Sequence, residues 1–87
     1  MRINQTTVIV AGKSYQLSGS EEPAYFNHLA TLCDRRIEES ALMNPDLDRE
    51  GAAVAAALSL ADEFVRARQE ADRLRQQLEM MSEPKKQ

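Results

Sequence analysis

The chain has 87 residues, with 11 Lys and Arg against 14 Asp and Glu, and a net charge of −3. This length allows one small domain with a limited core, so self-association is expected. The negative net charge, without any block rich in Lys and Arg, argues against nucleic acid as a ligand, because it removes the electrostatic attraction to phosphate.

The residues needed for catalysis or metal binding are scarce. The sequence has one His, His28, and one Cys, Cys33, which lie five positions apart on a predicted helix and so do not share a face. Its three glycines are too far apart for a phosphate-binding loop, and a zinc site needs about four Cys, His or carboxylate ligands. We therefore expect no enzyme activity, no cofactor and no metal.

The composition also indicates a cellular compartment. A single cysteine forbids an internal disulfide, which fits a reducing environment. The longest nearly apolar run, residues 52–61, is half of the ~20 residues needed to cross a bilayer, and residues 8–11 are too short for the apolar part of a signal peptide. The sequence predicts a cytoplasmic protein with no membrane insertion.

The first predicted element is a β-hairpin. Residues 6–10 are all β-branched, and residues 13–18 alternate polar and apolar side chains. Ala11 and Gly12 can form a two-residue loop, although Ala is a poor first residue of a type I′ turn, so a longer bulged loop fits equally well. The two-residue loop places four residues on one face of the hairpin: Val8, Val10, Tyr15 and Leu17.

A helix is predicted next. The segment Ser20-Glu21-Glu22-Pro23 has the acidic residues and early proline of a helix start. The helix is expected to end before Asn44-Pro45, because the residue that precedes a proline is pushed out of the α conformation. Its apolar stripe consists of Phe26, Leu29, Ala30, Cys33 and Ile37.

A second, much longer helix is predicted to run to about Ser82. Its N-cap is either Asn44, which places Pro45 at the first helical position, or Asp48. Such a helix is about 50 Å long at 1.5 Å per residue, more than a small head can cover. Apolar residues follow it in alternating steps of four and three, the seam of a coiled coil: Ala53, Ala57, Leu60, Phe64, Ala67, Ala71, Leu74, Leu78 and Met81.

Charges beside this seam favour a parallel dimer. Glu63 and Glu70 occupy g positions of the heptads, and Arg68 and Arg75 occupy e positions. A parallel two-stranded coil pairs each g residue with the e residue five positions later on the partner helix, which joins opposite charges here. An antiparallel pair would bring like charges together, so the expected oligomer is a parallel homodimer.

A second apolar row widens the sticky face in the first half of this helix. A wide face can pack under the head, or it can join two dimers side by side into a four-helix bundle, so a tetramer is expected beyond the dimer. The second row consists of Val54, Leu58, Ala61 and Val65.

The predicted fold class is α+β and mostly helical. Residues 1–46 form a head of hairpin and first helix, residues 47–82 form the long coiled-coil helix for oligomerisation, and residues 83–87 form a polar tail. A small basic surface on the head of an acidic protein suits an acidic protein partner, with ordinary solubilising charge as the alternative for each residue. The candidate partner-binding residues are Lys13, Arg35, Arg36 and Arg49.

Three segments together resemble the ZapA family of cell-division proteins. They are residues 8–17, residues 22–32 and, most specifically, residues 55–64 with the sequence Ala-Ala-Ala-Leu-Ser-Leu-Ala-Asp-Glu-Phe. The resemblance implies a protein that binds FtsZ and bundles its protofilaments at the mid-cell division site, as a dimer that can pair into a tetramer. It also implies that Lys13, after the hairpin glycine, contacts FtsZ. The sequence departs from the family pattern at Gln16, a position that is basic in the family.

A different class of function stays open from the residues alone. A small dimeric coiled-coil adaptor or regulator that binds another soluble partner through its head would have the same hairpin, seam and charges.

Overall fold

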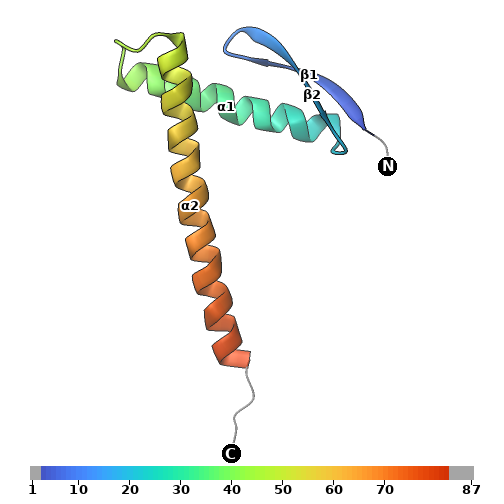
Figure 1. Ribbon diagram of the computed structural model, residues 1–87, viewed down its shortest axis with the longest axis vertical. Helices are drawn as coiled ribbons and strands as arrows, with labels where there is room; N and C mark the ends of the chain where they lie inside the picture. Colours follow the sequence, from blue (N-terminus) through green and yellow to red (C-terminus); the bar gives the residue numbers. More distant parts are fainter. Residues whose placement is uncertain (1–2, 83–87) are drawn as a thin grey trace, which may run out of the picture. The chain divides into compact units, whose positions relative to one another are not determined.

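The computed structural model describes residues 3–82, and the predicted polar tail lies outside this range. The element order is β1 (Asn4–Val10), β2 (Lys13–Gly19), α1 (Pro23–Met43) and α2 (Arg49–Ser82), as Figure 1 shows. The predicted α+β, mostly helical class with an N-terminal hairpin is confirmed.

The hairpin has the register that the two-residue loop predicts. Strands β1 and β2 pair antiparallel, with Val8 opposite Tyr15 and Val10 opposite Lys13. Both loop residues have positive φ, 54° at Ala11 and 79° at Gly12, which is the signature of a type I′ turn. Glycine adopts this conformation freely, whereas alanine is strained there by roughly 1 kcal/mol. The longer bulged loop is therefore wrong.

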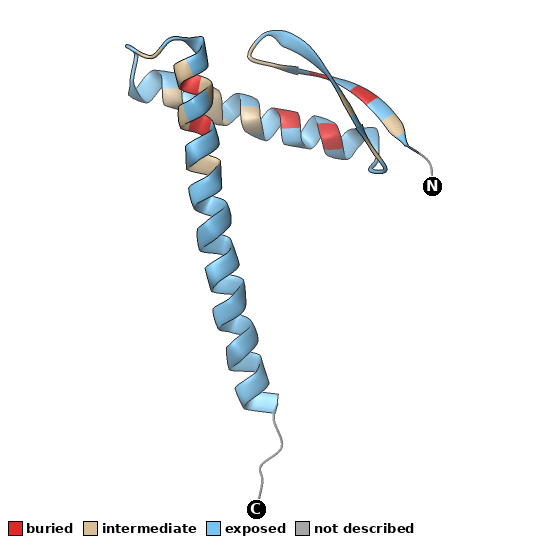
Figure 2. Cartoon of the chain, viewed as in Figure 1, coloured by how far each residue is buried: buried red, intermediate tan, exposed pale blue. Residues whose placement is uncertain are grey.

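The hairpin packs along α1 and forms the core of the head. Val8 and two residues of the α1 stripe, Phe26 and Ala30, are buried together, with Val10 and Leu17 packed against them. Figure 2 shows these buried positions on β1 and on the adjoining face of α1. At the end of β2, a Cβ on Gly19 would lie 2.8 Å from the Phe26 ring, so only glycine lets this ring come so close.

Helix α1 begins and ends where the prolines predict. Pro23 lies in the first turn, where its missing N–H costs no hydrogen bond, and Glu22 before it has an extended backbone. At the other end the Asn44 N–H donates to the Ser40 carbonyl oxygen at 3.1 Å, and Pro45 follows. The helix therefore stops before the Asn-Pro pair, as expected.

The structure decides between the two candidate caps of α2. The Gly51 N–H donates to Asp48 Oδ1 at 2.7 Å, so Asp48 is the N-cap. Asn44 belongs to the connecting loop, where its carbonyl oxygen accepts from the Leu47 N–H at 3.1 Å. The alternative with Asn44 as the cap is wrong, because this turn uses the Asn44 carbonyl oxygen before the helix starts.

The chain forms two compact units, one that ends at Ala57 and one that begins at Leu58. The first unit contains the start of α2, where Ala52 and Ala56 are buried. These two residues belong neither to the predicted seam nor to the predicted second row. The sequence analysis therefore did not identify the helical row that is buried in the first unit. In the second unit every residue from Ala61 to Ser82 is exposed (Figure 2).

Candidate functional site

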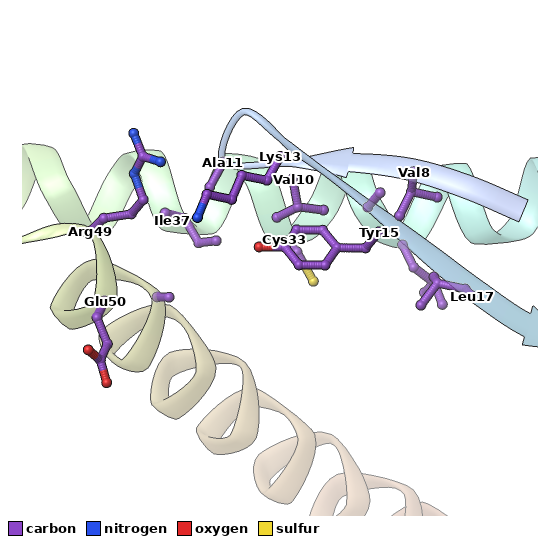
Figure 3. Close-up of a pocket in the computed structure, with 13 residues that line it drawn as sticks. Val8, Val10, Ala11, Lys13, Tyr15, Leu17, Cys33, Ile37, Arg49 and Glu50 are labelled. Atoms are coloured by element: carbon purple, nitrogen blue, oxygen red, sulfur yellow. The ribbon is translucent and has the colours of Figure 1, made fainter.

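An apolar groove of about 750 Å³ lies in the first unit, between the hairpin, α1 and the start of α2 (Figure 3). The predicted apolar face of the hairpin and most of the α1 stripe contribute its walls, which confirms both faces. The groove is lined by Val8, Val10, Ala11, Lys13, Tyr15, Leu17, Leu29, Ala30, Cys33, Ile37, Arg49, Glu50 and Ala53. Several apolar members stay accessible: Tyr15 is 49% exposed and Leu29 is 36% exposed.

Two of the four predicted basic residues lie on this groove. Lys13 follows the hairpin turn, Arg49 is the first residue of α2, and both are exposed. Figure 3 shows them toward the same end of the groove, with Leu17 toward the other. The fold therefore gathers two cations from segments far apart in the sequence at the rim of one apolar surface. Glu50 places a carboxylate on the same lining.

The other two basic candidates are not brought to the groove. Arg35 is exposed on α1, and Arg36 is half-buried with its Nε 3.4 Å from Glu39 Oε1. Neither residue lines the groove. Of the four predicted basic residues, Lys13 and Arg49 thus lie on the groove. A partner-binding role for Arg35 and Arg36 stays a prediction.

The hairpin turn is tied to α1 by a residue that the sequence did not single out. The Ala11 N–H donates to Asp34 Oδ1 at 2.9 Å across the boundary between hairpin and helix. In a two-residue hairpin the amide of the first loop residue has no partner within the strands, so this bond satisfies it. An Asp on the flank of an apolar stripe is the only sequence signal, and flanking acids are common.

The turn also lies beside the loop that connects the helices. A second hollow, of about 500 Å³, is lined by Gly12 and Asp34 together with Leu47 and Asp48 of that loop and Ala52 of α2. The hairpin tip and the cap of α2 therefore share one surface. This arrangement explains how Lys13 and Arg49 come to lie on one groove.

Of the two residues that suggest catalysis, Cys33 lines the groove and His28 does not. Cys33 is half-buried and lines the groove, as its place on the apolar stripe predicts, and His28 is exposed. Within residues 3–82 no group of three or more His, Cys, Asp and Glu side chains is placed to hold a metal ion.

The predicted oligomerisation rows are exposed in the single chain. On the seam, Phe64 is 61% exposed and Leu78 is 65% exposed, and Leu58 of the second row is 67% exposed. Apolar side chains of this size in an unbroken helical row are typical of a helix that packs against another helix. Only the start of the seam, at Ala53 and Leu60, is half-buried.

Most of the charges beside the seam have partners within α2. Arg68 lies over the Phe64 ring, 5.8 Å from its centroid, and Arg75 Nη1 is 3.0 Å from Asp72 Oδ1. Arg73 Nε donates to Glu70 Oε1 at 3.1 Å. This hydrogen bond, with the charge of Arg73, holds the pKa of Glu70 below its ordinary value. The interchain pairs that the heptads predict must compete with these contacts.

The fold and site define a small α+β protein with a hairpin-and-helix head, a cation-rimmed apolar groove and a long helix with an exposed coiled-coil row. The sequence profile of the family described as "Cell division protein ZapA" matches residues 6–86. The chain belongs to the ZapA family of cell-division proteins.

Individual relatives agree with this assignment. The chain is 35% identical to cell division protein ZapA of Shouchella clausii over 76% of this chain and 85% of the relative. It is 34% identical to ZapA of Geobacillus kaustophilus over 85% of this chain and 81% of that protein. A solved structure, the ZapA mutant dimer from Geobacillus stearothermophilus, matches with a TM-score of 0.75 and 30% identity, over 91% of this chain and 92% of that one.

The family resemblance inferred from the hairpin and from residues 55–64 is thereby confirmed. Across residues 3–82, the structure contains no helix with the length and apolar character needed to span a membrane.

Proposed function

We propose that this protein binds FtsZ through its head and cross-links FtsZ protofilaments as a homo-oligomer, which promotes assembly of the division ring at mid-cell. Membership of the ZapA family supports the role in division. The observation that carries the binding part is the convergence of Lys13 and Arg49 on one exposed apolar groove. Two cations beside apolar surface suit an acidic protein surface with apolar anchors.

The oligomer is proposed to be a parallel dimer joined along the seam, with the second row available for a tetramer. Support comes from the exposed apolar rows of α2 and from the dimeric state of the related Geobacillus stearothermophilus structure. Each head then binds at modest affinity, and the oligomer holds two sites at once. Linking two weak sites raises the overall avidity without any new contact.

The binding part is tested by charge reversal at the groove. Lys13→Glu and Arg49→Glu should each reduce co-sedimentation with FtsZ polymers by about tenfold or more, because an attractive contact becomes repulsive. Arg66→Glu is the matched control: it makes the same change of charge on an exposed residue of the second unit, which does not line the groove. Equal losses from all three variants would show a general charge effect and contradict a site at the groove.

The orientation of the dimer is tested by cross-linking. A cysteine placed at Leu78, with Cys33 replaced by Ser, should form a disulfide-linked dimer in high yield if the helices are parallel and in register. A cysteine at Gln76, on the outer face of the predicted coil, is the control. Absence of a trapped dimer at Leu78 contradicts the parallel coil.

A further inference from the structure

Asp34 occupies a place in the head that the family assignment does not explain. It comes from the flank of α1 and is exposed, yet its carboxylate reaches the hairpin turn. The acceptor Oδ1 lies 2.9 Å from the backbone nitrogen of Ala11. This separation is typical of a well-formed hydrogen bond.

The group that Asp34 holds is the strained one. Ala11 has φ of 54°, a left-handed conformation that non-glycine residues rarely adopt. Its neighbour Gly12 has φ of 79° at no steric cost and so supplies no restraint on the turn. The hydrogen bond from the Ala11 N–H to Asp34 Oδ1 therefore stabilises this turn conformation against the others that the loop could adopt.

The turn sets the position of Lys13. Lys13 is the first residue of β2, directly after Gly12, and pairs with Val10 across the turn. A change in the turn would alter the strand register, and a slip of one residue would move the Lys13 side chain to the other face of the hairpin. The Ala11 hydrogen bond thus fixes the residue that the groove presents to a partner.

We propose that Asp34 is a positioning residue: its carboxylate holds the Ala11-Gly12 turn so that Lys13 stands at the rim of the groove, ready to contact an acidic protein surface. This inference rests on the proposed function. The sign of the charge makes it distinctive, because a carboxylate near the turn weakens the attraction for an acidic partner. Electrostatics alone predicts that removing Asp34 tightens binding, whereas positioning predicts that it weakens binding.

The first test is a double-mutant cycle read by co-sedimentation of the full chain with FtsZ polymers. Asp34→Ala should weaken binding about three- to tenfold, the range of one hydrogen bond. In a Lys13→Ala background the same change should no longer weaken binding, because Asp34 positions Lys13. Asp34→Asn keeps an acceptor oxygen and removes the negative charge, so it should bind at least as tightly as the native protein. Asp62→Ala, which removes a carboxylate on the predicted outer face of the coil, is the matched control for charge.

The second test measures hydrogen exchange of the Ala11 amide by NMR. The amide should be protected in the native protein and in Asp34→Asn, and should exchange faster in Asp34→Ala. Alanine is the best helix former, so α1 should keep its structure, which the exchange of its other amides reports. An Ala11 amide that exchanges in the native protein like one open to water would overturn the proposal, with no variant needed.

The outcomes separate this inference from the proposed function. Suppose that Lys13→Ala weakens binding but Asp34→Ala does not. Or suppose that Asp34→Ala weakens binding by the same factor in the native and in the Lys13→Ala background. In either case the role of Asp34 is wrong and the proposed function stands. If Lys13→Ala binds like the native protein, the contact assigned to Lys13 is wrong and the positioning role of Asp34 falls with it. Tighter binding by Asp34→Ala shows a purely electrostatic effect and also overturns the proposal.

Discussion

The head and the second half of α2 use apolar residues in opposite ways. In the head, Val8, Phe26 and Ala30 form a buried core between the hairpin and α1. From Ala61 to Ser82 the helix buries no residue, although Phe64 and Leu78 repeat at the spacing of a seam. Exposed apolar rows of this kind mark a surface for contact with another protein. The head has a core of its own, whereas this part of the helix leaves its apolar face exposed.

The largest expected effect comes from removing a side chain of the buried core of the head. Phe26→Ala should lower the free energy of unfolding of the head by about 3 kcal/mol or more, because it removes the largest side chain of the core. The neighbouring aromatic residue is a matched control: Tyr25 is 47% exposed, and Tyr25→Ala should cost under about 1 kcal/mol. Denaturant unfolding measures both. A similar loss from the two variants would contradict the assigned core.

The next largest effect is expected from a charge placed on the predicted seam of α2. Leu78→Asp should weaken self-association by about 30-fold or more, because it would bury a charge in the seam. Gln76→Asp adds the same charge on the predicted outer face and should leave association nearly unchanged. Sedimentation over a concentration series measures both variants. A Leu78→Asp protein that associates as strongly as the native chain would show that the seam is not the interface.

The junction between the two regions is tested at the cap of α2. Asp48→Ala removes the side chain that accepts from the Gly51 N–H and should cost about 1 kcal/mol of stability. Asn44→Ala, in the loop, should cost less, because the bond from the Asp46 N–H to its Oδ1 is 3.4 Å long. Thermal unfolding compares the two. A larger cost at Asn44 would move the start of α2 back to the rejected cap.

The strained backbone of the hairpin turn can be tested by substitutions at its two loop residues. Ala11→Asn should raise the stability of the head by about 0.5 kcal/mol, because Asn tolerates the left-handed conformation better. Gly12→Ala should lower it by roughly 1 kcal/mol. A Cβ at Gly12 meets no atom within 4 Å, so this loss would come from the backbone conformation. Opposite signs for the two variants, in chemical unfolding, are the result that supports a type I′ turn.

The smallest effect is a pH dependence of α2. The pKa of Glu70 is lower in the helix than in the unfolded chain, mainly through the hydrogen bond from Arg73. Stabilisation by this pair is therefore present above the unfolded pKa, 4.5, and is lost as the pH falls through the lower folded value. Arg73→Gln should reduce the thermal midpoint slightly at about pH 6, and by less at about pH 3. A difference that grows in acid would contradict the sign.

Local pattern was enough to predict every element. The β-branched residues and the alternation after Gly12 predicted the hairpin, and Pro23 and the Asn44-Pro45 pair predicted both ends of α1. These features depend on backbone sterics and side-chain periodicity, which act over a few residues. The choice of cap for α2 was different, because Asn44 and Asp48 are equally good caps in sequence. The hydrogen bond from the Gly51 N–H to Asp48 Oδ1 and the turn at the Asn44 carbonyl oxygen decided between them.

The site was predictable in part. Its apolar walls and its four basic candidates follow from the sequence, but the sequence does not show which of the basic residues line the same groove. Lys13 and Arg49 come together because the hairpin tip lies beside the loop between the helices, whereas Arg35 and Arg36 are on α1 away from the groove. The buried pair Ala52 and Ala56 was missed because three neighbouring helical rows there are equally apolar.

The sequence by itself determined the elements, the α+β class, the coiled-coil row and the ZapA family. The tertiary structure alone decided that Asp34 accepts from the hairpin turn and that Lys13 and Arg49 line one groove. The reason is range. Periodicity and propensity express interactions between residues close together in the chain, whereas a groove depends on contacts between segments 20 or more residues apart, which many sequences of the same pattern would arrange differently.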